Sequence, residues 1–243
     1  MKEASNVSAC VVLYRSGESV LDTVRCLEES TEKPEIFVVD NYCLDGVGAK
    51  LAQTWPQKEN LGFGRGNNVV LPLLHSRYHL LCNPDVTFPP ELIGRMTAWM
   101  DAHPEAVILT PKVMNPDGTE QFLPKGEVTI RERLGGCFRR WRRAYTLADV
   151  QVTEPREVQF ATGCFLFIRT EAFRKLQGFD PRFFLYQEDT DLGRRARELG
   201  KIIYHPDMVI THAWARENTR TLKGNLLQIQ SIFKYFHKWG WKW

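Results

Sequence analysis

Short apolar runs alternate with segments of helical periodicity in the first half of the chain, and this alternation restricts the fold more than any other feature. The runs at 7–14 and 35–40 are rich in Val, Ile, Leu and aromatic residues, as buried strands are. Between them, Val20, Val24 and Leu27 share one face of a predicted helix. Strands that alternate with helices form largely parallel sheets, so we predict an α/β domain with a mainly parallel, mixed sheet flanked by helices.

Further elements are predicted from the same patterns. One domain is expected over residues 1–218, followed by a helical tail over 219–243 in which Ile229, Ile232, Phe233 and Phe236 share an apolar face. We predict strands at 78–82, 106–110, 158–169, 201–205 and 208–213, and helices near 90–103, at 170–178 and at 190–200.

Bulk properties exclude several classes of protein. The chain has 243 residues, 43% of them hydrophobic, which is enough for a sizeable core and excludes disorder. Its apolar runs are far shorter than the roughly 20 residues that a membrane span needs, and no signal peptide is recognisable, so we expect a cytosolic protein. Six scattered cysteines without a CxxC pair indicate buried thiols rather than a zinc site.

Positive charge is concentrated in two places. Six arginines against one glutamate occur over residues 131–143, and the last eleven residues hold three lysines among aromatic rings. Such an uneven distribution indicates an anionic partner, which the charge alone leaves open as a phosphate, a nucleic acid or a membrane surface.

Polar residues close several predicted strands, where ligands bind in open α/β sheets. Asp40 ends one strand and suits a ribose or base contact, or equally an ordinary turn. Asp85, in "NPDV", suits a Mg²⁺ or Mn²⁺ site that neutralises a diphosphate, although Asn-Pro-Asp is also a common turn. His212 ends a further apolar run, and such a histidine is more often a core residue than a metal ligand.

The stretch "NLGFGRGNN" is rich in glycine but does not fit a dinucleotide site. Its glycines are spaced GxGxG rather than GxGxxG, and the preceding "TWPQKE" is a poor strand. We expect a loop whose backbone approaches a ligand closely, with Arg65, Asn67 and Asn68 as donors to phosphate or base.

Three carboxylates occur within "EDTD", before a predicted helix. Acids at a helix start are stabilised by the helix dipole, and Asp191 also lies four residues before Arg195. Asp189 lies at the expected helix entry, where its side chain can face a cleft. A structural role therefore suits Asp191, and an acid–base role suits Asp189.

Taken together, these stretches resemble the inverting family 2 glycosyltransferases of the GT-A fold, a Rossmann-like fold of nucleotide-diphospho-sugar transferases. Within that family they are similar to rhamnosyltransferases that build bacterial surface polysaccharides. The resemblance runs in family order over about residues 7–218 and is weakest over 119–157. It is carried by "VVLYRSGE", "VVDN", "NLGFGRGNN", "LLCNPDV", "GCFLFIRTEAFRKLQGFDPRFFLYQEDTDLGRRARELG" and "ITHAWAREN".

The resemblance assigns roles to the candidate residues. It implies that Asp40 and Arg65 contact the nucleotide. Asp85 would reach the diphosphate through Mg²⁺ or Mn²⁺, with His212 as a further metal or phosphate contact. Asp189 would be the catalytic base, beside Glu188. The donor side would also include Tyr14, Asn41, Gly62, Asn68 and Asn83, and the acceptor side Gly163, Cys164 and Tyr186. Asn83 replaces the first acid of the family's Asp-x-Asp pattern, which predicts looser metal binding.

The predicted activity is transfer of a sugar, L-rhamnose from dTDP-L-rhamnose, with inversion to a lipid-linked or lipopolysaccharide saccharide. The basic and aromatic segments would then contact an anionic membrane from the cytoplasmic side, with no nucleic acid as partner. Alternatives are another nucleotide sugar on the same fold, a glycoside hydrolase, a nucleotidyltransferase, or a non-catalytic protein that binds nucleic acid or membrane. Dependence on a nucleotide sugar separates the first of these from the rest.

Overall fold

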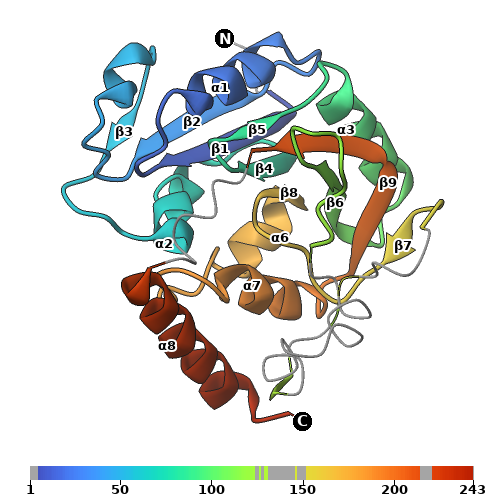
Figure 1. Cartoon of the computed structure of the whole chain (residues 1–243). Coiled ribbons are helices and arrows are strands. Elements are labelled where there is room, and N and C mark those ends of the chain that lie inside the picture. Colours follow the sequence, from blue (N-terminus) through green and yellow to red (C-terminus); the bar gives the residue numbers. More distant parts are fainter. Residues whose placement is uncertain are drawn as a thin grey trace.

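A computed structural model describes residues 5–123, 126, 129–130, 146, 152–213 and 221–242. In that part of the chain, nine strands form one sheet in the order β3-β2-β1-β4-β8-β6-β9-β5, with β7 paired to β9 (Figure 1). The strands are β1 (Val7–Leu13), β2 (Glu35–Asp40), β3 (Trp55–Pro56), β4 (Tyr78–Cys82), β5 (Val86–Thr87), β6 (Ala106–Met114), β7 (Arg156–Glu157), β8 (Phe165–Arg169) and β9 (Lys201–His212).

The sheet is parallel at one edge and mixed beyond it. β1 pairs in parallel with both β2 and β4, and β2 with β3, because a helix or a long loop returns the chain after each strand. β8 then lies antiparallel between β4 and β6, whereas β6 and β9 are parallel. The predicted mainly parallel, mixed α/β sheet is therefore confirmed.

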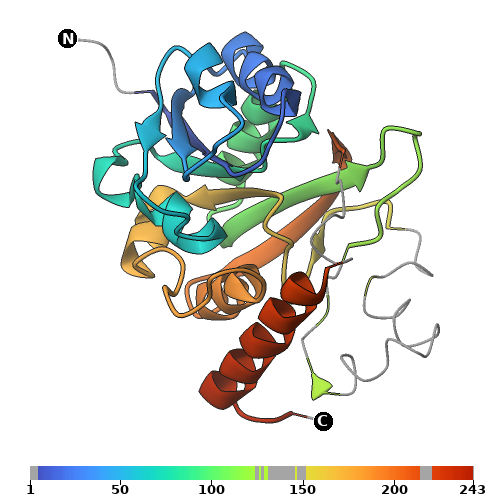
Figure 2. The same cartoon turned by 60° about the vertical axis from the view of Figure 1, so that its left-hand side comes forward.

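Helices cover both faces of the sheet (Figures 1 and 2). Alternate residues of β1 enter two separate cores, since successive side chains of a strand point to opposite faces. One core includes the apolar faces of α1 (Ser19–Glu29) and α3 (Leu92–Ala102), and the other includes residues of α6 (Thr170–Lys175) and α7 (Glu188–Ala196). Other helices whose bounds lie within the described residues are α2 (Phe63–Asn68), α8 (Leu222–Trp239) and the short 3₁₀ turns η1 (Val47–Lys50) and η2 (Leu71–Leu73).

Several predicted boundaries were wrong. The strand expected over 158–169 is restricted to β8, because the backbone before it leaves the sheet and Gly163 N–H donates to the Asp189 carboxylate. The two strands expected over 201–213 are one strand, β9, which stays paired with β6 across an irregularity after His205. The helix expected from Thr190 begins earlier, at Glu188.

The glycines of "GFGRG" are required by packing within the protein. A Cβ on Gly62, whose φ is +80°, would lie 2.0 Å from the carbonyl oxygen of Phe184. A Cβ on Gly64 would lie 2.8 Å from Cβ of Phe179, and one on Gly66 would lie 2.9 Å from Val12. The run therefore lets α2 pack tightly between β1 and the loop that leads into α7.

Helix α8 packs against this loop and α7. Tyr235 and Phe236 form a small buried cluster with Phe183. Ile229 and Phe233 are instead exposed, so the single apolar face predicted for the tail is divided between a packed side and a solvent side. Within the described residues, no helix combines the length and hydropathy needed to cross a bilayer.

The cysteines that the structure describes are free thiols. Cys10, Cys82 and Cys164 are buried, and burial raises the pKa of the Cys164 thiol to about 12. Cys26 and Cys43 are partly buried, and Cys137 lies outside the described residues. The prediction of buried thiols therefore holds fully for three of the six.

Candidate functional site

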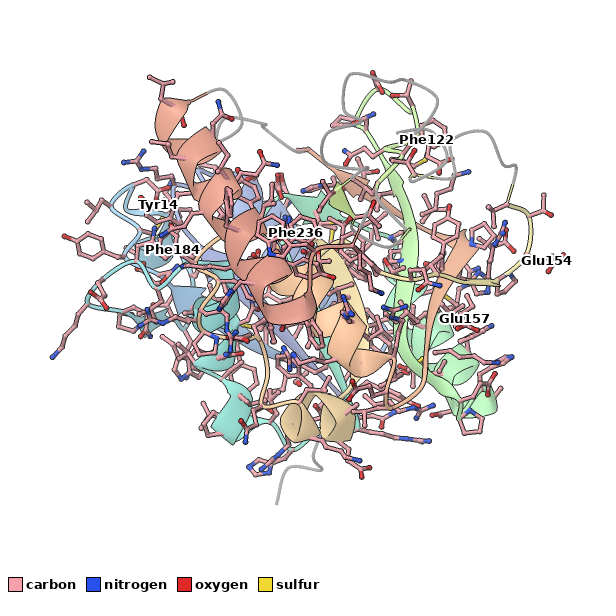
Figure 3. The ribbon with its side chains drawn as sticks, turned by 90° about the horizontal axis from the view of Figure 1, so that it is seen from below. Tyr14, Phe122, Glu154, Glu157, Phe184 and Phe236 are labelled. Atoms are coloured by element: carbon pink, nitrogen blue, oxygen red, sulfur yellow. The ribbon has the colours of Figure 1, made fainter. Side chains whose placement is uncertain are left out.

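The donor side of the candidate site lies beyond the carboxyl ends of β1 and β2. These strands pair in parallel with Leu13 opposite Asp40, which places Tyr14 beside the residues that follow Asp40. Tyr14 is exposed, and Asp40 is half-buried with Oδ1 accepting a hydrogen bond from Cys43 N at 2.8 Å. Figure 3 shows Tyr14 and Phe184 at one edge of the molecule, opposite Glu154 and Glu157.

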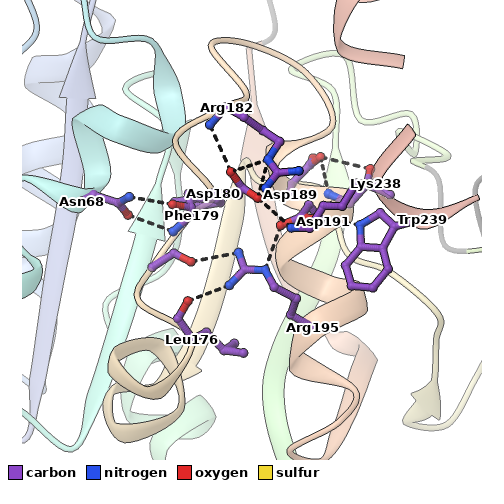
Figure 4. Close-up of polar contacts among 12 residues, drawn as sticks. Asn68, Leu176, Phe179, Asp180, Arg182, Asp189, Asp191, Arg195, Lys238 and Trp239 are labelled. Atoms are coloured by element: carbon purple, nitrogen blue, oxygen red, sulfur yellow. Dashed lines mark hydrogen bonds and ion pairs between the residues drawn. The ribbon is translucent and has the colours of Figure 1, made fainter. Parts of the chain in front are cut away.

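Two predicted donor-side asparagines hold loops in place. The buried side chain of Asn41 donates to Asn60 Oδ1 and to the carbonyl oxygen of Gly62, and accepts from Leu61 N at 2.8 Å. Asn68 donates from Nδ2 to the carbonyl oxygen of Phe179 and accepts from Phe179 N, at 2.8 and 2.9 Å (Figure 4). Both side chains use their amides on the protein itself.

Arg65 is the exposed residue of α2. Its neighbours Gly64 and Gly66 are buried against other parts of the fold. The guanidinium group therefore stands on a helix that is fixed on both sides, which suits a cation that must meet an anionic ligand at a defined place.

Asp85 and His212 lie side by side although they are 127 positions apart in the sequence. β5 pairs antiparallel with the end of β9, with Val86 opposite His212. Asp85 Oδ1 lies 3.2 Å from His212 Nε2, and the amide nitrogen of Asn83 lies 3.4 Å from the same ring atom. The Asp85 side chain is 20% exposed and that of His212 is 5% exposed, so a ligand would reach this pair from the side of Asp85.

The residues around Asp85 fit a divalent cation whose other ligands come from a phosphate group and water. Among the described residues no group of three His, Cys, Asp or Glu side chains gathers at one point. Two ligand atoms at right angles on a Mg²⁺-sized ion lie about 3 Å apart, close to the separation of Asp85 Oδ1 and His212 Nε2. The protein would therefore supply two ligands, and a bound diphosphate and water the others.

Gly163 and Cys164 connect the two halves of the candidate site. The carbonyl oxygen of Cys164 accepts a hydrogen bond from Asn83 N at 2.9 Å, next to Asp85. Gly163 N–H donates to Asp189 Oδ2 at 3.0 Å. One dipeptide thus joins the strand end that carries Asp85 to the helix that carries Asp189.

Asp189 lies in the first turn of α7 and is partly buried. Besides the contact with Gly163, its Oδ1 accepts from Thr190 N at 2.7 Å and from the Thr190 hydroxyl at 3.3 Å. Backbone N–H donors and the positive end of the helix dipole both favour a negative carboxylate here.

Glu188 is buried, and its Oε2 has no hydrogen-bond partner among the described residues. Burial, together with the charge of Asp189, raises the pKa of Glu188 well above its usual range. Both causes favour the protonated form of Glu188 beside Asp189.

Two consecutive residues before α7 adopt positive φ angles. Tyr186 has φ +68° and Gln187 has φ +66°, a conformation that non-glycine residues rarely adopt. The strain is offset by the contacts that hold Asp189 and Thr190 just after the turn. The turn aims the first residues of α7 toward Gly163.

The structure gathers the predicted residues at one end of the sheet, in two groups joined by the dipeptide. Sequence reasoning missed Gln121, which is buried and bonded to His212 through both ends of its amide. No local pattern marks this residue, because its partner lies 91 positions away.

Comparison with known proteins matches this chain to the family model "Glycosyl transferase family 2" over residues 8–177. A curated relative is the N-acetylglucosaminyl-diphospho-decaprenol L-rhamnosyltransferase of Mycobacterium tuberculosis. It is 28% identical over 235 residues, covering 86% of this chain and 76% of that protein.

Solved glycosyltransferase structures share the fold. The mannosyltransferase PcManGT of Pyrobaculum calidifontis, in complex with GDP-Man and Mn²⁺, superposes with a TM-score of 0.64 at 16% identity, covering 97% of this chain and 65% of that one. TarS of S. aureus, residues 1–349, gives 0.61 at 17% identity, covering 96% and 72%. GalNAc-T7 with UDP, GalNAc and Mn²⁺ gives 0.64 at 14% identity, covering 86% of this chain and 44% of that one. The predicted GT-A fold is confirmed.

Proposed function

Because the chain belongs to glycosyl transferase family 2, we propose that it transfers L-rhamnose from dTDP-L-rhamnose to a hydroxyl of a lipid-linked saccharide, inverting the anomeric centre. The name of the mycobacterial relative supports both the sugar and a polyprenyl-diphosphate acceptor. Acceptors of the lipopolysaccharide type contain the same chemistry, a saccharide on an amphipathic anchor.

The observation that carries the proposal is the link between Asp85 and Asp189 through one dipeptide. Asn83 N bonds to Cys164 O, and Gly163 N bonds to Asp189 Oδ2. The residue proposed to bind the diphosphate and the residue proposed to accept a proton are therefore connected through two residues. Single displacement places the leaving group and the attacking hydroxyl on opposite faces of one sugar carbon, so both residues would have to lie near that carbon.

On the donor side, Asp40 and Tyr14 would contact the nucleoside and Arg65 the phosphates. Asn41 and Asn68 would act indirectly, by holding the loops that shape this surface, since their amides are bonded to protein. Asp85 and His212 would hold Mg²⁺ or Mn²⁺, which would neutralise charge on the departing diphosphate. Asn83 would hold the His212 ring in place beside that metal.

On the acceptor side, the attacking hydroxyl would lose its proton to Asp189 as its oxygen bonds to C1 of the sugar. The bond from C1 to the diphosphate oxygen breaks in the same step, and the nucleoside diphosphate leaves with the electron pair. The raised pKa of Glu188 favours its protonated form, which would leave Asp189 as the charged acceptor, and Tyr186 would line the acceptor side. General-base help of this kind contributes about 10² to 10⁴ in rate.

A panel of nucleotide sugars tests the proposed reaction. With polyprenyl-diphosphate-GlcNAc as acceptor, dTDP-L-rhamnose is expected to yield a product heavier by one deoxyhexose, and UDP-GlcNAc and GDP-mannose are not. Mass spectrometry detects the product, and NMR of its anomeric proton gives the stereochemistry. Transfer from another donor alone would contradict the rhamnosyl assignment but keep the glycosyltransferase. A retained anomeric configuration would contradict the role of Asp189.

An exposed apolar stripe on α8 supports contact with a membrane. Leu222, Leu226, Ile229 and Phe233 recur every three or four residues and are between 51% and 84% exposed. The Phe233 ring also contacts that of Trp241. This outward stripe would lie in the interfacial region of a bilayer, where apolar helix faces are inserted.

A residue that borders the arginine-rich run contacts the end of the tail. Ile130 N–H donates to the carbonyl oxygen of Lys242 at 2.8 Å, and the arginine-rich run at 131–143 follows Ile130 in the sequence. Basic residues, together with an apolar helix face, favour anionic lipid. We therefore propose peripheral attachment at the cytoplasmic face, where the lipid-linked acceptor would be presented.

Co-sedimentation with phosphatidylglycerol liposomes at low salt tests this attachment. The Phe233→Glu and Leu226→Glu variants are expected to bind several-fold more weakly than the wild type, because they place a charge in the stripe. Gln53→Glu adds the same charge to an exposed position outside α8 and serves as the matched control. Equal binding by all four proteins, or none by the wild type, would contradict the attachment.

A further inference from the structure

The side chain of Gln121 spans both ends of His212. Its Nε2 donates to the backbone carbonyl oxygen of His212 at 2.6 Å, and its Oε1 lies 3.2 Å from Nδ1 of the ring. Gln121 is itself fixed, because its backbone N–H donates to Val113 O at 2.8 Å and its carbonyl accepts from Leu123 N at 2.7 Å. It is also buried, so water does not readily replace these contacts.

The backbone carbonyl sets the orientation of the amide. A carbonyl oxygen only accepts hydrogen bonds, so the NH₂ group of Gln121 must face it. The other end of the amide is an oxygen that also only accepts, and this end faces Nδ1 of His212. The contact at 3.2 Å is a hydrogen bond only if Nδ1 carries a proton.

We infer that Gln121 is a positioning residue that holds neutral His212 in the tautomer protonated on Nδ1, which leaves a lone pair on Nε2. This inference rests on the proposed metal-assisted transfer and deepens it. Nε2 is the ring atom 3.2 Å from Asp85 Oδ1. In the opposite tautomer, Nε2–H would donate to Asp85 and block the lone pair that a cation needs.

The tautomer protonated on Nδ1 also accounts for the contact between Asn83 and the His212 ring. The amide nitrogen of Asn83, 3.4 Å from Nε2, is a donor that matches a lone pair on that atom. The carboxylate of Asp85 has no proton to donate, so a neutral ring in this tautomer and Asp85 present two acceptors to the same point. Two acceptors 3.2 Å apart are a site for a cation. With Asn83 in place of an acid, the His212 lone pair becomes the second protein ligand.

The tautomer can be measured in the wild-type protein without donor or metal. In ¹⁵N-labelled protein, two-bond ¹H–¹⁵N spectra recorded from pH 6 to 9.5 distinguish a protonated ring nitrogen from one with a lone pair, and the His212 ring is assigned through its backbone correlations. The expected neutral form has its proton on Nδ1. A neutral form protonated on Nε2, or a ring that stays doubly protonated up to pH 9.5, overturns the inference.

Metal affinity provides the second measurement. In Gln121→Met, which keeps the length of the side chain but removes the amide, Mn²⁺ affinity in the presence of dTDP is expected to fall 10- to 100-fold, the usual cost of removing such an outer contact. Electron paramagnetic resonance of free Mn²⁺ gives the affinity. Asp85→Ala should abolish binding, and Gln228→Met on α8 should leave it unchanged. Equal affinity in Gln121→Met and the wild type also overturns the inference.

The proposed function and the proposed tautomer of His212 can be contradicted independently of each other. If no nucleotide sugar supports transfer, the proposed function is contradicted, whereas the ¹⁵N spectra still report the tautomer. If Gln121→Met does not fold, the wild-type spectra alone decide. Within Gln121→Met, a shift of the neutral ring to the Nε2–H form would identify the effect as tautomer control, because a merely structural role would leave the tautomer unchanged.

Discussion

Replacing Asp189 with asparagine is expected to lower the rate of sugar transfer by about 10² to 10⁴ while leaving the affinity for dTDP unchanged. Asparagine keeps the size of the side chain and an acceptor for Gly163 N–H, but its amide has almost no basicity. The loss therefore falls on the proton transfer from the acceptor hydroxyl. Single-turnover product formation and calorimetry with dTDP measure the two quantities.

A matched carboxylate shows whether the effect belongs to this position. Asp22 is exposed on α1 and pairs only with Arg25 in an i,i+3 ion pair. Asp22→Asn should leave both the rate and the affinity unchanged. Turnover by Asp189→Asn within about tenfold of the wild type would refute its role as the base, given the usual size of general-base catalysis.

Replacing Asp191 with alanine is expected to destabilise the protein by about 3–5 kcal/mol, the usual cost of removing one partner from a buried ion pair. Asp191 is fully buried. It accepts from Arg195 Nε and Trp239 Nε1, each at 2.8 Å, and from Lys238 Nζ at 2.5 Å (Figure 4). Without the carboxylate, the two cations face each other across a site with little water.

Urea denaturation measures this loss. The exposed pair of Asp22 and Arg25 again supplies the comparison, and Asp22→Ala should cost less than about 1 kcal/mol because exposed ion pairs contribute little. If Asp191→Ala is too unstable to purify, Lys238→Met removes one partner and leaves the Arg195 and Trp239 contacts in place, so a smaller loss is expected. A loss of unfolding free energy below about 1 kcal/mol in Asp191→Ala would show that the contacts of Asp191 do not stabilise the packing of α8.

The two predictions separate carboxylates that lie two residues apart. Asp189 faces the Gly163 backbone, whereas Asp191 faces α8 and the arginine on its own helix. Lys238 also bonds to Asp180 at 2.7 Å, and Arg194 stacks on the Trp239 ring at 4.4 Å. α8 therefore packs against the side of α7 that carries Asp191, whereas Asp189, the residue proposed as the base, lies on another side of α7.

Sequence patterns predicted the parallel half of the sheet well. The strands around Cys10 and Val38 are continuous apolar runs, as buried parallel strands are, and the Val20, Val24 and Leu27 stripe matches the buried face of α1. In such sheets the polar residue at the carboxyl end of each strand lies at the ligand edge. The sequence alone therefore identifies Asp40 and Asp85 as candidate site residues.

The same patterns failed where the backbone leaves the regular sheet near the candidate site. Residues 158–164 are as apolar as a strand, yet β8 begins only at Phe165, because Gly163 and Cys164 bond to Asp189 and Asn83. The glycine pattern of α2 also gave no sign that a Cβ on these residues would meet Phe179 and Val12. Periodicity records which residues are apolar, and not the neighbour that each one meets.

The sequence by itself determined the fold class, the strand ends that carry acids, and the structural role of Asp191 beside Arg195. These depend on local alternation and on spacing within one helix, where contacts are set by a fixed geometric period. Only the tertiary structure decided that His212 meets Asp85, that Gln121 contacts the His212 ring, and that Lys238 completes the buried network. Those contacts join segments far apart in the chain, and their partners are chosen by how the whole sheet and its helices pack rather than by any pattern a single segment contains.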